Sequence, residues 1–264
     1  QRAAYEYNEK KYKYDAFISY RHVEPDQSVA KQVHQMIETF KPPKEFYEDG
    51  KKPTFRVFRD REELAARDLG ASIEEALETS RYLIVICSKR TPLSDWCQKE
   101  IETFKSLHGD ERIIPVLIEG EPDESFPQAL KELKRGDNES LQDVLAADIR
   151  PDEILQSDFS GYENLQNNNI SKLKELTKKS LNILKTEKYR IMATILGCSF
   201  GDLKQRDKER KNKLILTVSS MAGAVFLIFG LFMAIAYQKA EIARQEAVQS
   251  NTAILLKTAK DFLR

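Results

Sequence analysis

Short apolar runs alternate with segments of helical periodicity from residue 14 to residue 118. Compact runs rich in Val, Ile, Leu and aromatic residues, each of strand length, occupy residues 14–20, 54–58, 82–87 and 113–118. Apolar residues recur at helical spacing in residues 26–40, 71–79 and 95–107. Continuous apolar strands separated by helices indicate a parallel sheet covered on both faces. The pattern predicts an α/β fold with a flavodoxin-like, doubly wound parallel sheet.

The periodicity weakens beyond this point. Residues 119–127 and 135–140 are polar and rich in turn formers, so we expect loops there. Residues 141–154 predict a helix and a short edge strand. Residues 170–196 carry a leucine stripe and predict a long helix that packs on the sheet, followed by a charged helical connector at residues 202–213.

Residues 214–237 contain no charged side chain, although 32% of the whole sequence is charged. As a helix, this segment reaches about 36 Å at roughly 1.5 Å per residue, and the hydrocarbon core of a bilayer is about 30 Å thick. The alternative is a buried core helix, but such helices are usually shorter and keep a polar face. The segment predicts a single transmembrane helix, and its late position indicates an anchor instead of a cleavable signal peptide.

Flanking charge predicts the orientation of this helix. Cationic residues are retained on the cytoplasmic side of a span. Before the segment stand Arg206, Lys208, Arg210, Lys211 and Lys213, and after it stand only Lys239 and Arg244. We therefore expect a cell-membrane protein whose N-terminal portion is cytoplasmic and whose tail lies on the opposite side. The tail either continues the helix or self-associates as a coiled coil.

These patterns divide the chain into predicted regions. They are an N-terminal extension (residues 1–10), an α/β domain with a C-terminal helical extension (11–200), a basic connector (201–213), the transmembrane helix (214–237) and a polar helical tail (238–264).

Composition restricts the kinds of ligand that the chain is expected to bind. The chain has 42 basic and 42 acidic residues, so its formal net charge is zero and no overall basic field favours nucleic acid. The basic cluster before the span suits anionic lipid head groups of the bilayer. Three cysteines without metal-ligand spacing predict reduced, packed thiols, no metal site and no disulfide.

Candidate site residues follow the first and second predicted strands. Tyr20, Arg21 and His22 end the first strand, at the sheet edge where open α/β sheets bind ligands. Arg21 suits a phosphate, with a structural ion pair as the alternative, and His22 suits a hydrogen-bonded loop position. The charged loop after the second strand, which begins with Asp60, is either a lid or docking surface or an ordinary solvated connection.

Further candidates belong to the third strand and the next helix. Ser88 follows the third strand and should lie beside Glu100 in this topology, so we expect it to bind substrate together with Tyr20 and Asp60. Ser94 or Asp95 suits a helix cap, and Trp96 and Glu100 then lie on one face of the helix. An aromatic plane beside a carboxylate suits a substrate with a flat base and a cationic leaving group, although ordinary amphipathic helices also show this pattern.

In order, these segments resemble a TIR (Toll/interleukin-1 receptor) domain of the bacterial membrane-anchored type. YDAFISYRH resembles its first box, FRDREELAARDLGASI its second, and RYLIVICS with SDWCQKEIETF its third strand and WxxxE helix. The likeness covers roughly residues 11–135. Asp68-Leu69-Gly70 replaces the Pro-Gly of receptor-type loops, and no Phe-Trp third box is present.

The resemblance implies cleavage of NAD+ at the nicotinamide–ribose bond, with NAD+ as substrate and no cofactor. Glu100 takes the position of the catalytic glutamate, Trp96 packs on the base or ribose, and Arg21 with the loop of residues 60–70 contacts the diphosphate. The implied setting is signalling or defence, with self-association through TIR domains or binding to other TIR proteins. The alternatives are a non-catalytic TIR scaffold and, less in keeping with Arg21 and His22, a receiver-type regulator.

Overall fold

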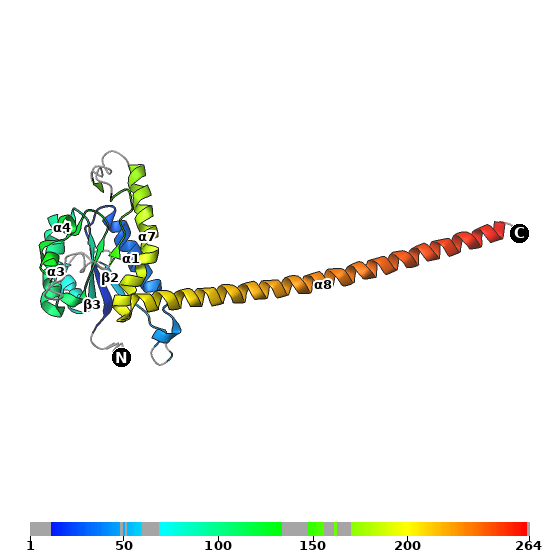
Figure 1. The fold of residues 1–264 in the computed structure, drawn as a ribbon, viewed down its shortest axis with the longest axis horizontal. Coiled ribbons are helices and arrows are strands. Elements are labelled where there is room, and N and C mark those ends of the chain that lie inside the picture. Colours follow the sequence, from blue (N-terminus) through cyan, green and yellow to red (C-terminus); the bar gives the residue numbers. More distant parts are fainter. Residues whose placement is uncertain are drawn as a thin grey trace. The chain divides into compact units, whose positions relative to one another are not determined.

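A computed structural model describes residues 12–47, 50, 52–59, 69–133, 147–155, 161–162 and 170–262 (Figure 1). Contacts divide the chain into two compact units, residues 1–207 and 208–264. The strands are β1 (Tyr14–Ser19), β2 (Val57–Arg59), β3 (Ser80–Cys87), β4 (Ile113–Leu117) and β5 (Ala147–Asp148). The helices are α1 (Asp26–Thr39), α2 (Leu69–Glu78), α3 (Asp95–His108), α4 (Pro122–Ser125), α5 (Gln128–Lys131), α7 (Ile170–Leu196) and α8 (Phe200–Phe262).

The strands form one parallel sheet in the order β2-β1-β3-β4-β5. The chain crosses over from β1 to the edge strand β2, returns to pair β3 with β1, and then adds β4 and β5 on the other side. This is the doubly wound topology that the apolar runs predict. In such a sheet, the strand order reverses beside β1, and ligands bind at the carboxyl edge near that reversal.

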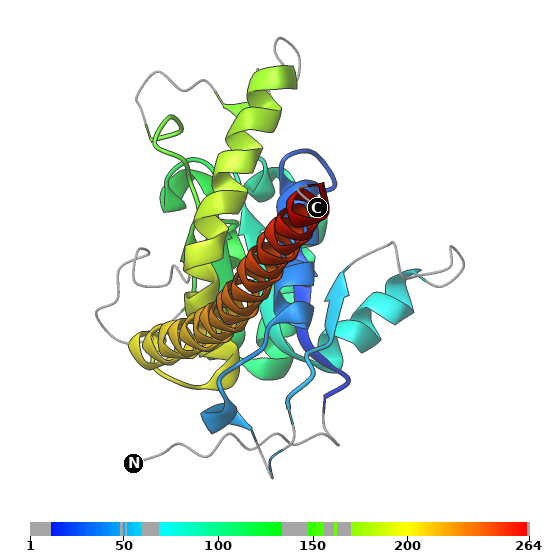
Figure 2. The ribbon, with the colours of Figure 1, turned by 90° about the vertical axis from the view of Figure 1, so that its right-hand side faces the viewer.

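Helices cover both faces of the sheet. Figures 1 and 2 show α1 and α7 side by side on one face, and Figure 1 shows α3 and α4 on the other. The pleat of β1 explains the two cores: Ala16 and Ile18 pack toward α1 and α7, whereas Phe17 packs toward α2 and α3. Strands buried on both faces read as continuous apolar runs, which is why β1, β3 and β4 are evident in the sequence.

Most element predictions are confirmed, and two differ. Residues 119–127 contain the short helix α4, because Pro122 starts the turn and Glu121 with Glu124 forms a capping box. β2 is shorter than expected, since this edge strand pairs only with β1 over Val57–Arg59. The edge strand expected within residues 141–154 is β5. Predictions for the extension 1–10, the loop 135–140 and Asp60 concern residues outside the described ones.

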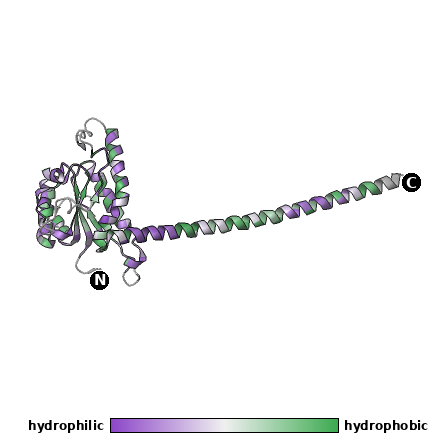
Figure 3. Ribbon diagram, in the orientation of Figure 1, coloured by the Kyte–Doolittle hydropathy of each residue, from purple (hydrophilic) through white to green (hydrophobic). Residues whose placement is uncertain are grey.

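α8 begins in the first unit, where Leu203 is fully buried and the Asp207 carboxylate accepts a hydrogen bond of 2.6 Å from the Tyr189 hydroxyl. Its remaining part forms the second unit. Within the described residues, α8 is the one helix long and apolar enough to cross a membrane, and the apolar side chains of its middle part are exposed. Figure 3 shows polar residues on both sides of this apolar stretch. The helix continues through the tail to Phe262.

Candidate active site

A cavity of about 440 Å³ lies at the carboxyl end of β1. Its walls come from the segment that follows β1 (residues 20–23), from Ile73 of α2, and from the start of α3 (residues 93–96 and Glu100). These segments are far apart in sequence. They meet because parallel strands direct the loops at their carboxyl ends to one edge of the sheet.

α3 brings Trp96 and Glu100 to this cavity. Ser94 caps the helix, and its Oγ accepts a hydrogen bond of 3.4 Å from the backbone N–H of Cys97. The spacing of four residues puts both side chains on the cavity side, as expected from the sequence. Their environments differ: the Trp96 side chain is 53% exposed, whereas Glu100 is only 5% exposed.

The Glu100 carboxylate has a direct hydrogen-bond donor. The Ser19 hydroxyl, at the last residue of β1, donates to Glu100 Oε2 at 2.5 Å, and Ser19 is fully buried. A hydroxyl bound to a carboxylate at this distance is a strong, charge-assisted hydrogen bond. Sequence analysis missed Ser19. The only signal was its place at the end of a strand next to two residues already singled out.

The segment after β1 lines the opposite wall. The Tyr20 ring is 4% exposed and lies 4.6 Å, centre to centre, from the His22 ring. Arg21 Nη1 donates to the backbone carbonyl of Arg90 at 2.9 Å, which fixes the guanidinium at the cavity. The structure thus brings Tyr20, Arg21, Trp96 and Glu100 to one cavity.

Ser88 does not line this cavity, contrary to the expectation that it lies beside Glu100. The chain turns sharply after β3, because the Ser88 N–H donates to Thr91 Oγ1 at 2.8 Å and the Thr91 hydroxyl donates to the Ile86 carbonyl at 3.1 Å. This turn directs the Ser88 hydroxyl to Asp26 Oδ2, at 2.8 Å.

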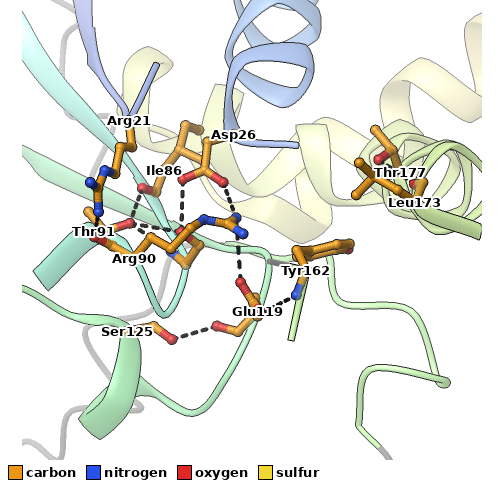
Figure 4. A network of polar contacts seen from close by, with 11 residues as sticks. Arg21, Asp26, Ile86, Arg90, Thr91, Glu119, Ser125, Tyr162, Leu173 and Thr177 are labelled. Carbon is orange, nitrogen blue, oxygen red and sulfur yellow. Dashed lines mark hydrogen bonds and ion pairs between the residues drawn. The ribbon is translucent and has the colours of Figure 1, made fainter. Parts of the chain in front are cut away.

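Asp26 and Ser88 belong to a buried polar network beneath the sheet edge (Figure 4). Arg90 Nη2 lies 2.6 Å from Asp26 Oδ1 and 3.5 Å from Glu119 Oε2. Glu119 Oε1 accepts a hydrogen bond of 2.9 Å from the Tyr162 N–H. The network ties the loops that follow β1, β3 and β4 to one another. Because Arg90 also holds Arg21 through its carbonyl, the network supports the cavity wall from behind.

Burial dominates the electrostatics of this network. Asp26 is fully buried, and burial raises the pKa of its carboxyl to about 6 although the Arg90 guanidinium and the Ser88 hydroxyl favour the ionised form. Burial likewise raises the pKa of the Cys97 thiol, beside Glu100, to about 11. Cys87 and Cys97 are buried free thiols, whereas the free thiol Cys198 is only partly buried. Within the described residues, no cluster of three or more His, Cys, Asp or Glu side chains suits a metal ion.

The chain is similar in part to several known proteins. The NAD(+) hydrolase ApTIR of Actinoplanes sp. is 33% identical over 110 residues, and the match spans 41% of this chain but only 14% of that relative. A metazoan TIR-STING receptor from C. gigas is 21% identical, with a TM-score of 0.36 over 47% of this chain and 37% of that chain. The TIR domains of the activated Roq1 resistosome are 17% identical, with a TM-score of 0.33 over 65% of this chain and 84% of that chain.

The family assignment rests on a sequence model of the TIR domain, which matches residues 16–154. That range contains most of β1, all of β2 to β5, both walls of the cavity, and Glu100. The chain therefore belongs to the TIR-domain family.

Proposed function

We propose that this chain is a membrane-anchored TIR-domain NAD+ nucleosidase in which Glu100 is the catalytic residue. The observation that carries the proposal is a carboxylate only 5% exposed that nevertheless lines an open cavity, with an exposed tryptophan beside it. The hydrolase name of the Actinoplanes relative supports the same chemistry, although the matched region is a small part of that protein.

In the proposed reaction the bond between ribose C1′ and the nicotinamide nitrogen breaks, and nicotinamide leaves as a neutral molecule with the bonding electrons. Positive charge then develops on the ribose, and the Glu100 carboxylate stabilises it electrostatically. Water adds at C1′ and loses a proton to the carboxylate, which gives ADP-ribose. Addition of an adenine nitrogen instead of water gives a cyclic product.

The other cavity residues have binding roles in this proposal. The exposed Trp96 ring packs on the nicotinamide or the ribose. Tyr20 forms the wall beside it, and Arg21, which is held by the Arg90 carbonyl, faces the diphosphate. Asp60 and Ser88 were also predicted to bind substrate. The structure gives Ser88 another partner, so we do not include it in the site.

Residues 214–237 are the proposed transmembrane segment, with the TIR domain on the cytoplasmic side. Confinement to a membrane raises the effective concentration of neighbouring domains and favours self-association. Protease digestion of sealed vesicles of known sidedness tests the orientation. Comparing nanodiscs that hold one copy with liposomes that hold many tests whether activity per molecule depends on association.

The deciding experiment measures nicotinamide release from NAD+ by the full chain in liposomes, with wild type, Glu100→Gln and Glu102→Gln compared. Glu100→Gln removes the charge at nearly constant shape and is expected to reduce the rate by about 10²–10³-fold. Glu102 lies on the exposed side of the same helix, so Glu102→Gln is expected to retain wild-type activity. Cleavage by Glu100→Gln at the wild-type rate would rule out the mechanism.

A non-catalytic scaffold is the second candidate. Trp96 and Leu93, at the cavity rim, are 53% and 73% exposed, and exposed apolar residues of this kind also suit contact with another TIR domain. In that case the folded wild-type chain in liposomes releases no nicotinamide, and Trp96→Ala weakens its self-association.

A further inference from the structure

Ser19 is placed by the sheet to contact Glu100. It is the last residue of β1, and the pleat directs it to the same face as Phe17, toward α2 and α3. Its hydroxyl donates to Glu100 Oε2 at 2.5 Å across 81 residues of sequence, and the Ser19 side chain is fully buried.

We propose that Ser19 is a positioning residue that holds the Glu100 carboxylate ionised and aimed at the cavity. The effect of Ser19 on catalysis rests on the proposed function, whereas its effect on the ionisation of the Glu100 carboxylate does not. A buried carboxylate pays a large desolvation penalty unless a donor compensates its charge. Ser19 supplies such a donor from a fully buried position at the end of β1.

The Cys97 thiol also lies near Glu100. It is 1% exposed, and burial raises its pKa to about 11, so the thiol stays protonated at neutral pH and adds no charge beside the carboxylate.

Other ionisable groups also face Glu100. Arg21, His22 and Asp95 line the same cavity, and Glu74 and Lys99 line a smaller hollow of about 60 Å³ between α2 and α3 that Glu100 shares. All of these groups are exposed or half-exposed, so water screens their charges. The Ser19 hydroxyl is buried and in direct contact with the carboxylate, so its loss should favour the protonated form of Glu100.

The test compares Ser19→Ala, Ser19→Thr and the control Ser80→Ala in the full chain in liposomes, over the pH–rate profile of NAD+ cleavage. On the acidic limb of the profile, kcat falls as Glu100 becomes protonated. Ser19→Ala is expected to raise the apparent pKa of this fall by about one pH unit or more, the equivalent of losing one hydrogen bond to a charged group. Ser19→Thr keeps the hydroxyl and should restore the wild-type limb. KM should change little in either variant, because Ser19 does not line the cavity.

Ser80 is a matched control because it is also a fully buried strand serine, whose hydroxyl donates to the Ala76 carbonyl at 2.6 Å. Ser80→Ala is expected to lower stability without moving the pH limb. Ser19→Cys fills nearly the same volume with a weaker donor and should move the limb in the same direction as Ser19→Ala. It serves as the test if Ser19→Ala fails to fold.

A titration that does not depend on turnover separates the two proposals. In chain labelled with ¹³C at the glutamate carboxyl, the Glu100 resonance is assigned by its loss in Glu100→Gln. A higher titration midpoint in Ser19→Ala and Ser19→Cys supports the positioning role, even if wild type does not cleave NAD+ and the proposed function fails. If wild type cleaves NAD+ and both variants keep its midpoint and its pH limb, the positioning role is overturned and the proposed function stands.

Discussion

Asp26 and Glu100 are two buried carboxylates near the same sheet edge, and their surroundings differ in kind. Asp26 is fully buried and faces the Arg90 guanidinium at 2.6 Å. Glu100 is 5% exposed, faces an uncharged hydroxyl and forms part of a cavity wall. The Asp26 pair holds loops together, whereas the place of Glu100 in the cavity wall is what the proposed catalytic role requires. Burial alone therefore does not distinguish the two carboxylates; access to the cavity does.

The comparison predicts that breaking the Asp26 pair affects stability most. Arg90→Met leaves Asp26 and Glu119 buried without their cation, and we expect a loss of about 3–5 kcal/mol in the free energy of unfolding. Urea unfolding of the full chain in detergent micelles, followed by the fluorescence of Trp96, the one tryptophan in the sequence, measures this loss.

Arg190→Met is the matched control for that measurement. Arg190 pairs with Glu187 at 2.9 Å and lies over the Phe200 ring, with 52% of its side chain exposed, so its replacement should cost only about 0.5–1 kcal/mol. Equal losses in the two variants would show that the buried network is no more important than a surface ion pair.

Burial of Asp26 also makes the free energy of unfolding depend on pH. The pKa of Asp26 is about 6 in the folded chain, above the ordinary value of 3.8. The folded state therefore binds this proton more tightly than the unfolded state does. The stabilisation from this group is fully present below about pH 4 and is lost as the pH rises through 6.

Asp26→Asn isolates this contribution because asparagine has nearly the same shape and does not titrate. The free energy of unfolding of wild type minus that of Asp26→Asn should fall between about pH 4 and pH 6 and then level off. A difference that rises over this interval would mean that the Arg90 ion pair outweighs burial at Asp26.

The sequence predicted the elements well because each strand and helix is encoded locally. The apolar runs of β1, β3 and β4 and the capped start of α3 sit within short windows, and the order of the strands then brings Tyr20, Arg21, Trp96 and Glu100 to one cavity. Side-chain partners at the sheet edge are encoded differently. They depend on the pleat and on turn geometry, which periodicity does not report.

Two serines illustrate this limit. Ser88 was predicted to face the substrate, yet the turn held by Thr91 directs it to Asp26, 62 residues earlier in the sequence. Ser19 was not predicted to have a role, yet the pleat of β1 directs it to Glu100. Both serines lie next to a strand end, and only the three-dimensional structure distinguishes them.

The smallest predicted effect concerns Trp96, because an exposed ring contributes little to folding. Trp96→Ala should change the free energy of unfolding by less than about 0.5 kcal/mol, measured by circular dichroism. If the ring packs on the substrate, the same variant should raise KM for NAD+ by about two- to tenfold, as expected from the loss of one aromatic contact worth roughly 0.5–1.5 kcal/mol, and leave kcat nearly unchanged. Leu107→Ala, on the same helix, 48% exposed and away from the cavity, should leave both constants unchanged. A fall in kcat with unchanged KM would instead place Trp96 against the reacting ribose in the transition state, and so next to Glu100 in function as well as in space.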